Sequence, residues 1–322
     1  MNYVFGPVPS RRLGQSLGID TIPLKTCNWN CVYCQLGRSV PLTSERREYF
    51  PRADILAEVE ITLSSHKAGE IDWLTFVGSG EPTLHSGIGW LIRQVKALTS
   101  LPVAVITNGS LLYRPEVRTE LSAADAVLPS LDAGTPDLYR KINRPWPELT
   151  FERLVDGLSL FRQEFSGKLW VEVMLVKGVN DTETALQELA AILKRIQPDQ
   201  VHLSLPIRPP AESWVQPAGD DSLRRAQAFL GKIASVLIPS LAQSEFTETG
   251  DLEATLLSII TRHPMPEQDL IGGLPAWQPE QIREALTRLE VQGRAQKVRR
   301  FGTWFWSAGG SVYDRTGRAE DE

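Results

Sequence analysis

Strand-like apolar runs alternate with amphipathic helical stretches from residue 17 to about residue 240, and this alternation restricts the fold more than any other feature. The expected strands cover residues 17–22, 71–77, 102–107, 126–131, 169–176 and 201–206. The expected helices cover residues 54–65 (with Asp54 as N-cap), 86–99, 114–122, 151–165, 182–196 and 220–236. Such alternation predicts right-handed βαβ units and a parallel sheet. The six units are fewer than those that close a TIM barrel, and a flat, doubly wound sheet fits the same pattern.

A second, smaller unit is expected after this region. Residues 242–251 are polar and indicate a linker between a first domain at 1–241 and a second at 252–308. The second domain is expected to contain helices at 252–262, 267–271 and 279–292, the last ended by Gly293, and a hairpin at 294–307 that turns at 301–303. Three helices followed by a β-hairpin are typical of a winged helix. Residues 309–322 are polar, and we expect them to form a flexible tail.

The bulk composition indicates a folded intracellular protein of about two domains. The chain has 322 residues, 42% of them hydrophobic, which suffices for one large core and a small satellite. Its formal net charge of −5 gives no reason to expect a binder of polyanions. The sequence has no apolar run of about 18 residues and no signal-peptide core, so we expect no membrane association. Reduced, unpaired cysteines fit a cytoplasmic protein.

All three cysteines of the chain lie within eight residues, as Cys27, Cys31 and Cys34 of the segment CNWNCVYC. Iron–sulfur clusters are usually held by four thiolates, so three thiolates leave one iron open to an outside ligand. An open coordination position is typical of catalytic rather than structural metal sites. Three unrelated core thiols are the alternative, and the clustering favours the metal site.

The cysteine segment, with Tyr33 before its last cysteine, resembles the cluster loop of the radical S-adenosylmethionine (radical SAM) superfamily. The segment VGSGEPTL at 77–84 resembles the glycine-rich segment of the same family. The resemblance covers roughly residues 14–240 and implies a partial (β/α)6 barrel. It also implies a [4Fe–4S] cluster on the three cysteines, with SAM chelating the fourth iron. An electron from the cluster, supplied by a flavodoxin or ferredoxin, would cleave SAM to methionine and a 5'-deoxyadenosyl radical.

The resemblance also assigns residues to SAM binding. They are Tyr33, Gly78, Ser79, Gly80, Glu81, Asn108, Ser130, Asp132 and Arg208. Tyr33 would lie near the adenine, and residues 78–81 would let the backbone approach the methionine end, although the family commonly has glycine where Ser79 stands. The later polar residues follow strand ends and would bind the ribose or a carboxylate. From the residues alone, Asn108-Gly109 is equally a turn dipeptide and Asp132 a cap.

The opening GPVPSRRLG at 6–14 resembles one branch of radical SAM proteins that is grouped loosely with tRNA wyosine synthases. Arg11 and Arg12 would bind an anion there, or form a solvated basic pair. Wyosine synthases use a second cluster, and this chain has no cysteine left to hold one. The same absence argues against methylthiotransferases and against peptide-modifying enzymes with auxiliary clusters.

The substrate is not evident from the sequence. We favour a protein or peptide over RNA, and a glycyl-radical-enzyme activase is one alternative. A nucleic-acid-binding iron–sulfur regulator is another, because the expected hairpin carries Arg294, Lys297, Arg299 and Arg300 beside aromatic residues. Residues 252–306, however, hold seven Lys/Arg and six Asp/Glu, a net charge of +1, and this favours a protein or domain contact.

Overall fold

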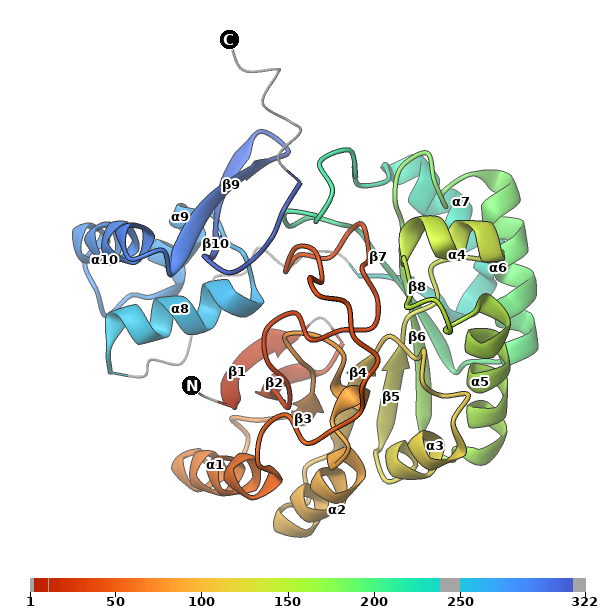
Figure 1. Cartoon of the computed structure of the whole chain (residues 1–322), viewed down its shortest axis with the longest axis horizontal. Helices are drawn as coiled ribbons and strands as arrows, with labels where there is room; N and C mark the ends of the chain where they lie inside the picture. The colour runs from red at the N-terminus through yellow and green to blue at the C-terminus, as the bar shows by residue number, and fades with distance from the viewer. Residues whose placement is uncertain (1–2, 11, 238–249, 315–322) are drawn as a thin grey trace.

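A computed structural model describes residues 3–10, 12–237 and 250–314 (Figure 1). Its centre is an eight-stranded sheet in the order β1 to β8. The strands are β1 (Val4–Ser10), β2 (Gly14–Ile19), β3 (Trp73–Phe76), β4 (Val103–Thr107), β5 (Ala126–Pro129), β6 (Lys168–Met174), β7 (Gln200–Ser204) and β8 (Ala234–Val236). β1 is antiparallel to β2, and every later pair is parallel.

The helices between the strands are α1 (Arg52–Ser65), α2 (Ile88–Leu98), α3 (Pro115–Leu121), α4 (Pro136–Ile142), α5 (Phe151–Glu164), α6 (Glu183–Ile196) and α7 (Asp220–Leu230). Two short 3-10 helices follow β3 and α7, at η1 (Pro82–Leu84) and η2 (Gly231–Ile233). None of the helices in the described ranges is long and apolar enough to cross a membrane.

The sequential strand order decides between the two predicted sheet types. Each right-handed crossover advances in the same direction, so the crossover helices fall on one face of the sheet. Figure 1 shows α1, α2, α3, α5 and α6 along the outer side of the strands. A doubly wound sheet reverses its strand order, so the flat alternative is wrong. The observed sheet has the strand order of a (β/α) barrel.

Several elements differ from the sequence expectation, among them α4, where no helix was expected. β1 was not expected, because two prolines and a glycine interrupt its seven residues; such residues are tolerated in an edge strand. The helix expected at 220–236 ends at Leu230, where Gly231 takes a positive φ of 74°, and β8 follows. α1 begins at Arg52, so Asp54 lies inside its first turn and is not the N-cap.

The barrel interior contains a small apolar cluster formed mainly by Leu13, Leu128 and Trp170. Arg12, from the opening motif, forms an ion pair with Glu172 of β6. Both side chains are largely buried. Arg12 is therefore not part of a solvated basic pair, and Arg11 lies outside the described residues.

The C-terminal unit, residues 252–308, has its own apolar core. It consists of α8 (Leu252–Arg262), α9 (Glu267–Gly273), α10 (Pro279–Val291), β9 (Ala295–Arg300) and β10 (Thr303–Ala308). Phe301 and Gly302 form the hairpin turn with φ of 54° and 75°, as a two-residue turn with both residues left-handed requires. The order of elements is the expected one, and assignment to the winged-helix class stays a prediction. Most of the expected linker, residues 242–249, lies outside the described residues.

The segment expected to begin a flexible tail is held in place over residues 309–314, which we call the C-terminal segment. Arg38 N donates to Val312 O at 2.6 Å, and Asp314 N donates to Ala211 O at 2.8 Å. Tyr313 Oη donates to Gln35 O at 2.6 Å. This packing could not be predicted from the polar composition, because the contacts are made by backbone groups and one buried tyrosine. Residues 315–322 lie outside the described ranges.

Close packing at Gly134 gives a test of the fold. A Cβ on Gly134 would lie 2.4 Å from Glu188 C and Leu189 N of α6, whereas a Cβ on Gly219 would meet nothing within 4 Å. Gly134→Ala should therefore destabilise the protein by about 1–3 kcal/mol, because the backbone of α6 must move. Gly219→Ala should cost less than about 1 kcal/mol. Urea unfolding measures both, and equal midpoints would contradict the packing.

Candidate functional site

The three cysteines lie in a loop after β2, which we call the cysteine loop and define as residues 25–38. Lys25 Nζ donates to Cys34 Sγ at 3.1 Å, and Trp29 N donates to Cys27 Sγ at 3.4 Å. Burial disfavours the charged form of Lys25, yet all three thiols act on it and its pKa is raised. The three sulfurs therefore lie within electrostatic reach of one buried amine.

The surroundings of Cys27 and Cys31 favour metal binding over nucleophilic catalysis. Burial raises the pKa of Cys27 to about 12 and that of Cys31 well above its usual value. Protonated, buried thiols are poor nucleophiles, whereas a coordinated metal deprotonates a thiol outright. Within the described ranges, no three His, Cys, Asp or Glu side chains are placed to hold a single metal ion. In a four-iron cluster each thiolate binds a different iron, so a set of three thiols in one loop fits such a cluster with one iron left open.

The glycine segment, residues 78–81 after β3, packs directly against the start of the cysteine loop. Lys25 N donates to Ser79 O, and Glu81 N donates to Thr26 O at 2.9 Å. A Cβ on Gly80 would lie 1.9 Å from Thr26 O. Position 80 must therefore be glycine, because the backbone of Thr26 occupies the space that a side chain would need. Thr26 directly precedes Cys27.

Glu81 braces this segment against the end of β4. Its buried carboxylate accepts hydrogen bonds from Thr83 N at 3.0 Å, Thr83 Oγ1 at 2.5 Å, Thr107 Oγ1 at 2.6 Å and Asn108 N at 2.6 Å. Burial raises the pKa of Glu81, and these donors oppose that shift. Since both carboxylate oxygens have protein partners, Glu81 positions the glycine segment instead of presenting a free carboxylate.

Asn108, at the end of β4, lies at the cysteine loop. Its Nδ2 donates to Asn28 Oδ1 at 2.7 Å and lies 3.9 Å from Cys27 Sγ. Its Oδ1 accepts from Ser110 N at 2.9 Å, which is the turn geometry that Asn-Gly favours. Asn108 therefore forms the predicted turn and lies beside the cysteine loop, and its role in SAM binding stays a prediction.

Asp132, after β5, joins Tyr33 to two residues that the sequence did not indicate. Its carboxylate accepts from Tyr33 Oη at 2.5 Å, Asn143 Nδ2 at 2.6 Å and Met174 N at 2.8 Å. Burial raises the pKa of Asp132, and these bonds oppose the shift. Asn143 also lies 3.7 Å from Cys31 Sγ. Asp132 is thus tied to the cysteine loop rather than acting as a helix cap.

The last two predicted residues are Ser130 and Arg208. Ser130 is half-buried at the end of β5, in a bridge to Glu172. Arg208 was predicted to contact a carboxylate of SAM. Its Nη1 lies 3.2 Å from Gln35 Oε1 and 3.2 Å from His263 Nδ1 of the C-terminal unit, and the SAM contact stays a prediction. Arg208 therefore has partners in the cysteine loop and in a distant part of the chain.

Comparisons with known proteins agree with these features. Residues 21–190 match the radical SAM superfamily. The UPF0026 protein of Methanocaldococcus jannaschii is 36% identical over 272 residues, which cover 83% of this chain and 84% of that protein. GTPase Obg of Brachyspira hyodysenteriae is 40% identical over 264 residues, which cover 81% of this chain but 38% of that protein. Most of that protein is thus unmatched, and its name says nothing about this chain's activity.

A structure of TYW1, a wyosine synthase, with a lysine–pyruvate adduct bound has a similar fold. It covers 68% of this chain and 74% of its own, with 18% identity and a TM-score of 0.52. At this identity the likeness concerns the fold alone.

The two glycines of the site predict different outcomes on substitution. Gly80→Ala should displace Thr26 and the adjacent Cys27, so anaerobic reconstitution with iron and sulfide should give a clearly lower iron content. Gly78→Ala should retain the iron content, because its Cβ would meet only side-chain atoms of Ile22 and Asp20 at 3.1–3.3 Å. Iron analysis of both variants checks this. Full iron loading of Gly80→Ala would show that the close contact does not position the cysteine loop.

Proposed function

Because the chain belongs to the radical SAM superfamily, we propose that it is an enzyme that cleaves S-adenosylmethionine reductively, with Cys27, Cys31 and Cys34 as ligands of a [4Fe–4S] cluster. Members of this family use such a cluster and SAM. The cluster supplies the electron that splits SAM into methionine and a 5'-deoxyadenosyl radical, which takes a hydrogen atom from the substrate. The observation that carries the proposal is the contact of the cysteine loop with the glycine segment.

The chain's own residues have distinct tasks in this proposal. The glycine segment would present its backbone to the methionine end of SAM. The charge of Lys25 balances negative charge on the three thiolates. Asp132 holds Tyr33 in a fixed orientation at the end of the cysteine loop. A flavodoxin or ferredoxin delivers the electron.

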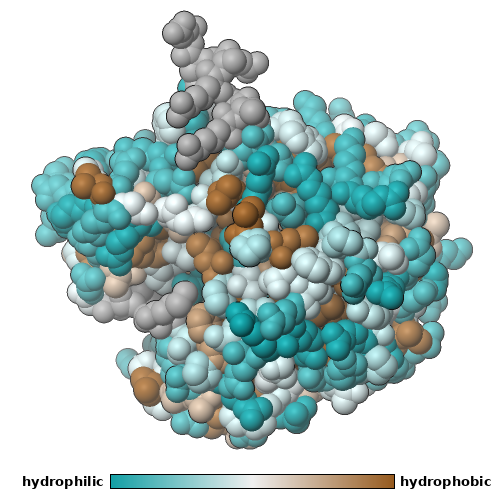
Figure 2. Space-filling model, in the orientation of Figure 1, coloured by the Kyte–Doolittle hydropathy of each residue, from teal (hydrophilic) through white to brown (hydrophobic). Residues whose placement is uncertain are grey.

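An apolar surface near the site supports a protein or peptide substrate. Figure 2 shows apolar side chains gathered at the centre of this face, over the part of the fold that holds the cysteine loop in Figure 1. Val40, Trp214 and Val312 are 66%, 44% and 45% exposed, and they come from segments at or next to this loop. An exposed apolar surface of this kind is typical of a protein interaction site. A glycyl-radical-enzyme activase is one enzyme with such a substrate.

We propose that the C-terminal unit is a winged helix that packs on its own catalytic domain. Basic residues of the hairpin region have partners within the chain. Lys297 lies 3.6 Å from Glu290, Arg294 lies 3.8 Å from Glu253, and Arg300 donates to Asp314 O at 2.7 Å. Side chains engaged in this way are less available to phosphates.

The central prediction concerns iron and SAM. Anaerobically reconstituted protein should bind about four irons per chain and, with dithionite and SAM, release 5'-deoxyadenosine. Cys27→Ala, Cys31→Ala and Cys34→Ala should each lose both properties, whereas Glu45→Ala, exposed beyond the cysteine loop, should keep them. Iron analysis and chromatography of the products measure the outcome. A stable cluster in the triple alanine variant would refute the ligand assignment.

The second prediction concerns nucleic acid. The full chain should show no binding to RNA or DNA that falls steeply between about 50 and 200 mM salt, because a phosphate binder must release counterions. Fluorescence anisotropy with labelled oligonucleotides is a suitable measurement. If salt-sensitive binding is seen and is lost when Arg294, Lys297, Arg299 and Arg300 are all changed to Ala, the substrate hypothesis moves to RNA.

A further inference from the structure

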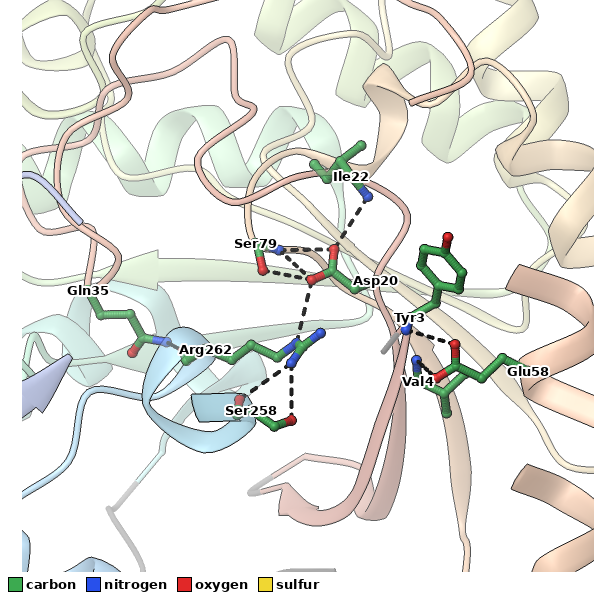
Figure 3. A network of polar contacts seen from close by, with 9 residues as sticks. All are labelled: Tyr3, Val4, Asp20, Ile22, Gln35, Glu58, Ser79, Ser258 and Arg262. Atoms are coloured by element: carbon green, nitrogen blue, oxygen red, sulfur yellow. Dashed lines mark hydrogen bonds and ion pairs between the residues drawn. The ribbon is translucent and has the colours of Figure 1, made fainter. Parts of the chain in front are cut away.

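The C-terminal unit reaches the candidate site through the last residue of α8. Figure 3 shows Arg262 extending from α8 toward Asp20, which follows β2. Arg262 Nε lies 3.5 Å from Asp20 Oδ2, and the two side chains are only 12% and 6% exposed. An ion pair this far from water is sensitive to the loss of either partner, since the remaining charge is left buried.

Asp20 in turn holds the glycine segment. Ser79 Oγ donates to Asp20 Oδ2 at 2.6 Å, and Ser79 N donates to Asp20 Oδ1 at 3.2 Å. Ile22 N donates to the same carboxylate at 3.4 Å. Ser79, which stands where the family commonly has glycine, is thus the residue of the glycine segment that donates hydrogen bonds to the Asp20 carboxylate. The hydroxyl adds a bond that glycine cannot make.

Arg262 is itself fixed by several contacts. Its guanidinium carbon lies 4.3 Å from the centre of the Phe5 ring, and Nη1 lies 3.3 Å from Ser258 Oγ. Its backbone oxygen accepts a hydrogen bond from Gln35 Nε2 at 2.8 Å. Gln35 directly follows Cys34. Arg262 therefore contacts the cysteine loop through its backbone oxygen, and it contacts Asp20, which holds the glycine segment, through its side chain.

We propose that Arg262 is a positioning residue for SAM, acting through Asp20 to set Ser79 and the adjacent glycine backbone. This inference rests on the proposed function and adds that the C-terminal unit completes the SAM-binding site. The contacts of Arg262 given above are with Asp20, Phe5, Ser258 and Gln35, so we expect iron binding to persist without its side chain. The side-chain contact and the backbone contact with Gln35 can be separated by substitution, because alanine keeps the backbone oxygen.

The test is SAM binding by the reconstituted full chain, measured by equilibrium dialysis alongside iron content. Arg262→Ala should weaken SAM binding about tenfold while iron content stays at the wild-type level. Arg262→Lys should restore part of the affinity because it keeps the charge. The matched control is Arg288→Ala, which removes an ion pair with Glu253 inside the C-terminal unit, at 2.8 Å, and should leave SAM binding unchanged.

A double-substitution cycle identifies the route. Asp20→Asn should weaken SAM binding to a similar degree. Adding Arg262→Ala to Asp20→Asn should change the affinity little, because Arg262 acts through Asp20. Additive losses would overturn the proposal. Ser79→Ala should give a smaller loss, since Ser79 N still donates to Asp20, and it tests the route if Arg262→Ala fails to fold.

Two further outcomes are distinct. Loss of iron together with SAM binding in Arg262→Ala would assign Arg262 to the docking of the cysteine loop and overturn its role in positioning SAM. If the wild-type chain itself takes up iron but binds no SAM, the proposed function fails. In contrast, unchanged SAM affinity in Arg262→Ala and Asp20→Asn overturns the inference about Arg262 alone.

Discussion

The site depends on one close backbone contact, between Gly80 and Thr26. β2 and β3 are neighbouring parallel strands, so the loops that leave their carboxyl ends lie side by side. The hydrogen bond from Glu81 N to Thr26 O then fixes the glycine segment against the cysteine loop at 2.9 Å. Any side chain at position 80 would separate the two loops, since its Cβ would lie 1.9 Å from Thr26 O. The spacing between the thiols and the glycine backbone is therefore set by main-chain atoms.

Features encoded locally could be predicted from the sequence. β2 to β7 follow from apolar runs of strand length, and the two motifs follow from short segments whose residue types limit their chemistry. Partners distant in sequence could not be predicted. Arg208 lies 55 residues from His263 along the chain, and Tyr33 lies 99 residues from Asp132. Asn143, at the end of the short helix α4, gave no pattern at all, because its importance comes only from the tertiary contacts it makes.

The charges of the C-terminal unit show the same limit. Composition gives a net charge near zero for residues 252–306, and this argues against a strongly basic surface. It did not show that Arg262 pairs with Asp20 across the interface while Arg288 pairs with Glu253 inside the unit. Two arginines of one small unit thus have opposite relations to the site. The position of each arginine on its helix determines whether it pairs with the site or within the C-terminal unit.

The C-terminal segment also affects how the site is assembled during synthesis. Tyr313 donates to Gln35 O across a separation of 278 residues. At a translation rate of about 5–20 residues per second, the cysteine loop emerges roughly 15–55 s before the segment that covers it. During this interval the loop lacks its contacts with Val312 and Tyr313, and until residue 262 emerges it also lacks the contact with Arg262. The nascent cysteine loop is therefore open on that side until residues 309–314 have left the ribosome.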